Sequence, residues 1–109
     1  MKTSDLDGRC PIDLAFEVIG GKWKPVILYQ LAGGTLRYGE LQRAVPKATQ
    51  RMLTLQLREL ERDGMLTRTV HASVPPKVEY TLTEPARRLL PILETMGQWL
   101  LDNHGEVRP

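Results

Sequence analysis

The spacing of apolar residues changes at Gly64, and this change limits the folds that the chain can adopt. Before the glycine, Leu53, Leu57 and Leu60 recur every three or four positions. This spacing predicts a helix over residues 49–63 with one apolar stripe, which Gly64 would end. After the glycine, apolar and polar residues alternate, which is typical of half-buried β-strands.

Two strands are expected, over residues 66–71 and 78–82, because β-branched and apolar side chains recur there at every second position. The loop between them, residues 72–77, contains Pro75-Pro76. Proline fixes one backbone dihedral angle, so the pair restricts the loop. The segment therefore predicts a β-hairpin with a stiff, projecting loop.

Glycine and proline residues divide the rest of the chain into four further amphipathic segments. A short stretch at residues 35–37 allows no more than one strand bridge, and Pro91 is expected to kink the last helix. The helices are expected to begin near Pro11, Trp23, Tyr38 and Glu84. This order predicts a mainly α fold with a β-hairpin wing (α+β), a winged helix-turn-helix.

Length and composition are typical of one cytoplasmic domain. With 109 residues, the chain is expected to form a single domain over residues 10–103, between a flexible N-terminal tail, 1–9, and a C-terminal tail, 104–109. No apolar run is long enough for a membrane span, and the start is too polar for a signal peptide. The single cysteine, Cys10, excludes an internal disulfide and a multi-cysteine metal site. No cofactor or metal is expected.

Positive charge is concentrated in the middle of the chain. Residues 22–82 carry ten basic and five acidic side chains, whereas acidic side chains predominate in both flanking segments. This distribution favours contact between the middle segment and phosphate groups.

The helix over residues 49–63 is the candidate recognition helix for the major groove of DNA. Thr49 is expected to cap its start and to bond a phosphate. Gln50, Arg51 and Thr54 are expected to contact base edges, since arginine pairs with guanine and glutamine with adenine. Arg58, further along, is expected to contact phosphate. In isolation, this face would instead be interpreted as the solvated side of a surface helix.

Two further residues on the outward side of this predicted helix each have two possible roles. Leu55 could meet a thymine methyl group or pack against the hairpin, and packing is preferred. Arg62 could equally be solvated.

Other cations flank the recognition helix. Lys22, Lys24 and Arg37 lie at the starts of neighbouring elements and are expected to contact backbone phosphate. Trp23 and Tyr38 are expected in the core or as groups that position phosphate contacts.

The hairpin loop is the candidate wing, beside the minor groove. Lys77 is expected to contact DNA there, because a loop ordered in advance loses little entropy on binding. Arg68 is expected either to contact DNA or to pair with Glu79 across the hairpin.

Several blocks of the sequence resemble one known family, the HxlR-type transcriptional regulators, which are relatives of the MarR group. The resemblance extends over residues 9–103 and departs from the family pattern at Lys47, Ala48, His71 and Ala86. The matching blocks are Cys10-Pro11-Ile12, Gly20–Pro25, Leu36–Leu41, Met52–Thr54, Leu57–Glu61 and Val74–Thr83. The resemblance implies a homodimeric, cytoplasmic repressor or activator that binds a double-stranded DNA operator.

Cys10 matches a cysteine through which some family members sense oxidants or electrophiles. Its expected place at a helix N-terminus, beside Arg9, favours the thiolate form. Oxidation would give sulfenic acid or a disulfide to another molecule. The alternative is an inert small apolar residue.

The first and last helices carry more apolar side chains than a domain of this size can bury. Leu93, Met96 and Leu100 follow one stripe of the last helix, and Trp99 lies to its side. We expect these residues, together with Leu14 of the first helix, to form a dimer interface. The alternative is that the last helix only closes the monomer core.

The function expected from the sequence is therefore sequence-specific DNA binding, most simply as a repressor. The effector and the operator sequence do not follow from the sequence. The alternative is a winged-helix module for protein docking, against which Arg51 and Arg58 argue. No acid, base or metal-ligand constellation favours an enzyme, and RNA binding lacks aromatic platforms.

Overall fold

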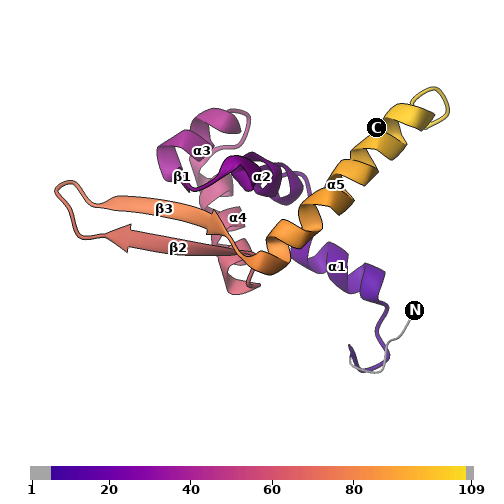
Figure 1. The fold of residues 1–109 in the computed structure, drawn as a ribbon, viewed down its shortest axis with the longest axis horizontal. Coiled ribbons are helices and arrows are strands. Elements are labelled where there is room, and N and C mark those ends of the chain that lie inside the picture. Colours follow the sequence, from indigo (N-terminus) through magenta and orange to yellow (C-terminus); the bar gives the residue numbers. More distant parts are fainter. Residues whose placement is uncertain (1–5, 108–109) are drawn as a thin grey trace.

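The computed structural model describes residues 6–107 (Figure 1). Residues 1–5 of the predicted N-terminal tail and residues 108–109 of the C-terminal tail lie outside the described part. The elements follow one another as α1 (Pro11–Ile19), α2 (Lys24–Gln30), the 3-10 turn η2 (Leu31–Gly33), β1 (Leu36–Arg37), α3 (Tyr38–Ala44), α4 (Gln50–Arg62), β2 (Leu66–His71), β3 (Lys77–Leu82) and α5 (Glu84–Asn103). This order confirms the predicted α+β winged helix-turn-helix.

The three strands form one antiparallel sheet in the order β1-β3-β2. The short β1 makes two residue pairs with β3, Leu36 with Tyr80 and Arg37 with Glu79, one more than expected. The hairpin of β2 and β3 projects to one side of the molecule, and α1 and α5 extend on the other (Figure 1). The wing and the terminal helices are therefore separate ends of the fold.

The core lies where α2, α3, α4 and the start of α5 meet the sheet. The apolar stripe predicted for α4 is confirmed, since Leu53, Leu57 and Leu60 are buried. On α2, Ile27 and Leu28 are buried, whereas Val26 is 42% exposed. The largest fully buried side chains are Ile27, Leu28, Leu31, Leu41, Leu53, Leu57, Leu60 and Leu66.

Both ends of α4 are fixed by local contacts. The hydroxyl of Thr49 accepts a hydrogen bond from the backbone N–H of Met52 at 3.1 Å, so the predicted N-cap is confirmed. Gly64 ends the helix with a φ of 80°, which a side chain would disfavour. The Thr83 hydroxyl donates to the carbonyl of Gly64 at 2.7 Å. This bond fastens the end of α4 to the start of α5.

The last helix is continuous over Glu84–Asn103, although Pro91 lies inside it. The Thr95 hydroxyl donates to the carbonyl of Pro91 at 2.9 Å. The proline therefore does not end the helix.

Candidate nucleic-acid interface

The predicted recognition residues lie together on the outward face of α4. Gln50, Arg51 and Arg58 are exposed and Thr54 is half-buried, since the apolar stripe on the opposite side holds the helix to the core. These side chains line one shallow hollow, whose residues are Thr49, Gln50, Arg51, Thr54, Leu55 and Arg58.

Leu55 is 51% exposed, so the expected packing against the hairpin is wrong. The side of α4 that faces the sheet carries Leu57 and Glu61, which line a hollow with Val78 and Tyr80. Leu57 is two positions after Leu55, roughly 200° around the helix. Leu55 therefore points away from the sheet and belongs to the outward face.

Tyr38 ties the start of α4 to α3. Its hydroxyl lies 3.1 Å from the carbonyl oxygen of Gln50 and 3.0 Å from the hydroxyl of Thr54. Residue spacing does not indicate these contacts, because they join residues 12 and 16 positions apart across a turn. The first turns of α4 are thus held from outside the helix as well as from its own cap.

Lys24 does not belong to the interface, contrary to the prediction. Its side chain is buried in the first turn of α2, and its Nζ lies 2.8 Å from Oε1 of Glu59 on α4. A lysine that is buried and paired in this way cannot extend to a phosphate. Its contact holds α2 against α4 instead.

The other two flanking cations are exposed. Lys22 has its Nζ 5.0 Å from the centre of the Trp23 ring, and Trp23 is buried in the core. Arg37 precedes α3, and its backbone N–H donates to the Glu40 carboxylate at 2.9 Å. Both side chains can reach solvent.

The wing carries the predicted lysine at its base. Lys77 is exposed and lines a hollow together with Arg37 and the loop residues from Ser73 to Pro76. The Ser73 hydroxyl donates to the carbonyl of Pro75 at 2.7 Å, which closes the loop on itself. Two of the predicted cations, from distant parts of the sequence, thus come together.

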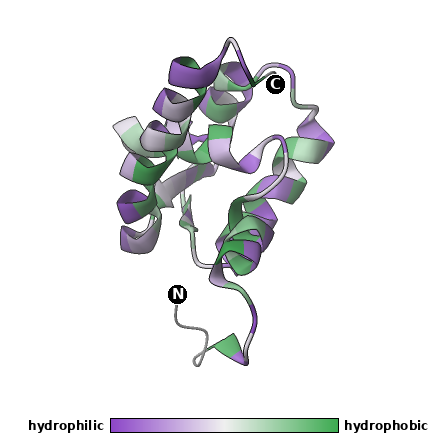
Figure 2. Cartoon of the chain, turned by 90° about the vertical axis from the view of Figure 1, so that its right-hand side faces the viewer, coloured by the Kyte–Doolittle hydropathy of each residue, from purple (hydrophilic) through white to green (hydrophobic). Residues whose placement is uncertain are grey.

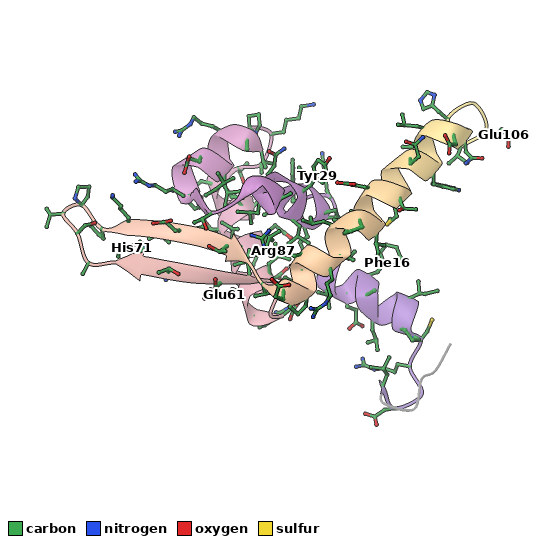
Figure 3. All side chains as sticks on the ribbon, viewed as in Figure 1. Phe16, Tyr29, Glu61, His71, Arg87 and Glu106 are labelled. Atoms are coloured by element: carbon green, nitrogen blue, oxygen red, sulfur yellow. The ribbon has the colours of Figure 1, made fainter. Side chains whose placement is uncertain are left out.

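The predicted pairing of Arg68 with Glu79 is wrong. Glu79 pairs with His71, with 2.7 Å between Nε2 and Oε1. His71 lies near the far end of the hairpin (Figure 3). The register sets Arg68 opposite Tyr80 instead. Arg68 then lines the hollow between α4 and the sheet, with Arg58 and Tyr38.

Arg62, at the end of α4, is engaged by its neighbour. Its guanidinium donates two hydrogen bonds to the Asp63 carboxylate, at 3.0 and 3.2 Å. These bonds lower the pKa of Asp63, which keeps the carboxylate ionised. Arg62 is therefore paired within the chain.

The apolar surface of α5 changes along the helix. Near its start Leu89, Leu90 and Leu93 pack against the core, as expected for a helix that closes the monomer. Further along, Met96 is 46% exposed and Trp99 is 55% exposed. The expectation that α5 closes the monomer core therefore holds for its first half, and its second half leaves apolar side chains exposed.

The exposed half of α5 faces the same end of the molecule as α1. Met96 and Trp99 line an apolar hollow with Ile92 and Leu100. Phe16, 55% exposed, projects from α1 on the side of α5 (Figure 3). Leu14, two positions earlier on α1, is half-buried. Figure 2, which views this end, shows apolar residues on its helices.

Cys10 is exposed at the position before α1. Its carbonyl accepts the first helical hydrogen bond, from Leu14, at 3.1 Å. The expected place at the helix N-terminus is confirmed.

Residues 6–107 contain neither a metal-ligand cluster nor a helix that could span a membrane. No group of three or more histidine, cysteine or acidic side chains in residues 6–107 could hold a metal ion. No helix in the same range is both long and apolar enough to cross a membrane.

Comparison with known proteins identifies the family. A family model described as an HxlR-like helix-turn-helix matches residues 18–107. The chain belongs to this family. It is 53% identical over 97 residues to YdeP, an HTH-type transcriptional regulator of Bacillus subtilis, covering 89% of this chain and 75% of YdeP. The resemblance inferred from the sequence blocks is thereby confirmed.

Solved structures of similar regulators share the fold. The oxidized form of the redox regulator HypR is 52% identical, with a TM-score of 0.80, over 86% of this chain and 97% of HypR. The crystal structure of the putative HTH-type regulator YtcD is 48% identical, with a TM-score of 0.84, over 90% of this chain and all of YtcD.

Proposed function

We propose that this HxlR-family chain, a DNA-binding transcriptional regulator, reads its operator with the first turns of α4 in the major groove. The observation that carries the proposal is the outward face of α4. Gln50, Arg51, Thr54 and Arg58 project together from a helix whose other side is buried and whose start is capped. A helix of this kind suits the major groove.

Each exposed side chain has a role that follows from its chemistry. Arg51 pairs with a guanine, and Gln50 with an adenine. Arg58 and the flanking Lys22 and Arg37 contact phosphates, and the capping Thr49 contacts another at the helix N-terminus. The wing, residues 72–77, lies beside the minor groove with Lys77 on the backbone.

The regulator acts in the cytoplasm as a homodimer, with residues 10–103 as its DNA-binding and dimerising domain. The exposed apolar side chains of α1 and α5 support this part of the proposal. Leu14, Leu93, Met96, Trp99 and Leu100 contribute to the contact. Two recognition helices then meet half-sites roughly one helical turn apart, and occupation of such an operator represses transcription.

Oxidants or electrophiles regulate binding through Cys10. The exposure of the thiol and the similarity to HypR, a redox regulator, support this role. Oxidant treatment should change the DNA affinity of the wild type and leave that of Cys10→Ser unchanged. An equal response of both proteins would exclude Cys10 as the sensor.

A protein-docking module is not favoured. Arg51 and Arg58 are exposed and no acidic side chain lines the hollow that they share. The family relatives are transcriptional regulators as well.

The proposal is tested by selecting bound duplexes from random DNA. The wild type should recover an inverted repeat, and Arg51→Ala should bind that repeat with a free energy weaker by roughly 1–3 kcal/mol and relaxed sequence choice at one position in each half-site. Arg88→Ala, at an exposed arginine of α5, is a control outside the proposed interface. Unchanged affinity of Arg51→Ala for the selected repeat would refute the assignment.

A further inference from the structure

Tyr38 holds two polar groups of α4 at once. It is the first residue of α3, and its ring packs partly against the core. Its hydroxyl lies 3.1 Å from the Gln50 carbonyl oxygen and 3.0 Å from the Thr54 hydroxyl. Both contacts lie at the edge of the proposed base-reading face.

The number of protons available decides the direction of these bonds. A tyrosine hydroxyl carries one proton, and a backbone carbonyl can only accept. The Tyr38 proton is therefore given to Gln50. The bond between Tyr38 and Thr54 then requires Thr54 to donate its own proton to the tyrosine oxygen. The Thr54 hydroxyl retains only acceptor lone pairs for any third partner.

We propose that Tyr38 sets the base preference of Thr54 by making its hydroxyl an acceptor toward DNA. The inference rests on the proposed entry of α4 into the major groove. An acceptor there pairs with an exocyclic amine, which adenine and cytosine carry. Guanine and thymine present only acceptor atoms in this groove, so they leave the threonine oxygen without a bond. Thr54 therefore selects adenine or cytosine at the base that it contacts.

The position of Thr54 fits this role. Its side chain is half-buried, and it lines both the outward hollow of α4 and the hollow between α4 and the sheet. It can therefore contact Tyr38 on one side and a base on the other. Tyr38 acts through Thr54 and is a positioning residue for base recognition.

Tyr38→Phe isolates the effect, because it removes the hydroxyl and keeps the ring. The Thr54 hydroxyl is then free to rotate, and can donate to guanine or thymine as well as accept from adenine or cytosine. The base preference at that position should disappear while the remaining preferences persist. Thr54→Val removes the hydroxyl itself and serves as the matched variant.

The experiment measures the affinity of each protein for the selected operator with all four base pairs at each position of a half-site. In the wild type, the position that responds to Thr54→Val should prefer adenine or cytosine by about tenfold. In Tyr38→Phe the same preference should fall to within about twofold. Thermal unfolding of Tyr38→Phe shows whether the variant is folded, and Arg51→Ala should retain the preference at this position.

Three results would overturn the inference. A preference for guanine or thymine at the Thr54 position would mean that the hydroxyl donates to DNA. An unchanged preference in Tyr38→Phe would mean that the tyrosine does not set it, and no position responding to Thr54→Val would mean that Thr54 contacts no base. A different result would refute the proposed function itself, namely that Arg51→Ala also leaves every base preference unchanged.

Discussion

The start of α4 and the end of α5 are both exposed, but the first is polar and bonded to another helix, whereas the second is largely apolar and open. At the start of α4, Thr49 caps the helix and Tyr38 bonds Thr54. At the end of α5, Met96 and Trp99 lie open to solvent, and no described residue buries them. A polar surface ordered in advance suits DNA, whereas an open apolar surface suits a second copy of the chain.

The largest effect is expected at the apolar surface. Met96→Glu combined with Trp99→Glu introduces two charges that a dimer interface would have to desolvate. The dissociation constant of the dimer should rise by about 100-fold or more, as sedimentation equilibrium would measure. The variant should retain its fold, because both side chains are already exposed in the single chain.

Glu94→Lys is the matched control for that experiment. It reverses a charge on α5. Position 94 lies two residues from Met96, however, and so points roughly 160° away from it around the helix. Dimerisation should persist in this variant. Dimerisation of the Met96 and Trp99 double variant with wild-type affinity would show that α5 is not the interface.

A smaller effect, on stability, is expected at the contact that holds α4 in place. Lys24→Met leaves the Glu59 carboxylate without its partner at 2.8 Å. Glu59 is partly exposed, so the free energy of unfolding should fall by about 1–3 kcal/mol rather than by the larger cost of a fully buried pair. Urea denaturation measures the change. Lys22→Met, at an exposed lysine, should change stability by less than about 0.5 kcal/mol.

The N-cap of α4 should contribute less to the free energy of unfolding than the pair of Lys24 and Glu59 does. Thr49→Ala removes the hydroxyl that accepts from the Met52 N–H, which should cost about 1 kcal/mol in urea denaturation. Thr49→Ser, which retains the hydroxyl, should restore most of it. Equal stability of the alanine and serine variants would show that the cap does not hold the helix.

The smallest effect concerns pH. The pKa of Asp63 is lowered by its bonds to Arg62, so the folded state binds this proton less readily than the unfolded chain does. The pair therefore adds stability above the ordinary carboxyl pKa of about 3.9 and loses it as the pH falls through the lower folded pKa. Asp63→Asn should be slightly less stable than the wild type at pH 7 in urea denaturation, and the difference should vanish in acid.

Sequence patterns predicted the parts of the molecule that local spacing controls. The stripe of Leu53, Leu57 and Leu60 and the alternation in the hairpin depend on periods of a few residues, and the structure has both elements. The outward positions of Gln50 and Arg51 follow directly from that stripe. These expectations needed no knowledge of the distant chain.

The failures at Lys24 and in the pairing of Arg68 both involve partners that are distant in sequence or set by the strand register. Lys24 appeared free because nothing near it in sequence indicates Glu59, which lies 35 positions away. The sequence suggested Glu79 as a partner for Arg68, but the register sets Arg68 opposite Tyr80, and the Glu79 carboxylate pairs with His71 instead. Such contacts depend on how helices and strands pack, which residue spacing does not specify.

Chemical protection of guanine tests the central assignment most directly. Dimethyl sulfate methylates guanine N7 in the major groove, where Arg51 is expected to bond. On the selected operator, the wild type should protect one guanine in each half-site, and Arg51→Ala at saturating concentration should expose that guanine while other protection persists. Identical protection by both proteins would contradict the assignment of Arg51, and no major-groove protection by the wild type would contradict the placement of α4.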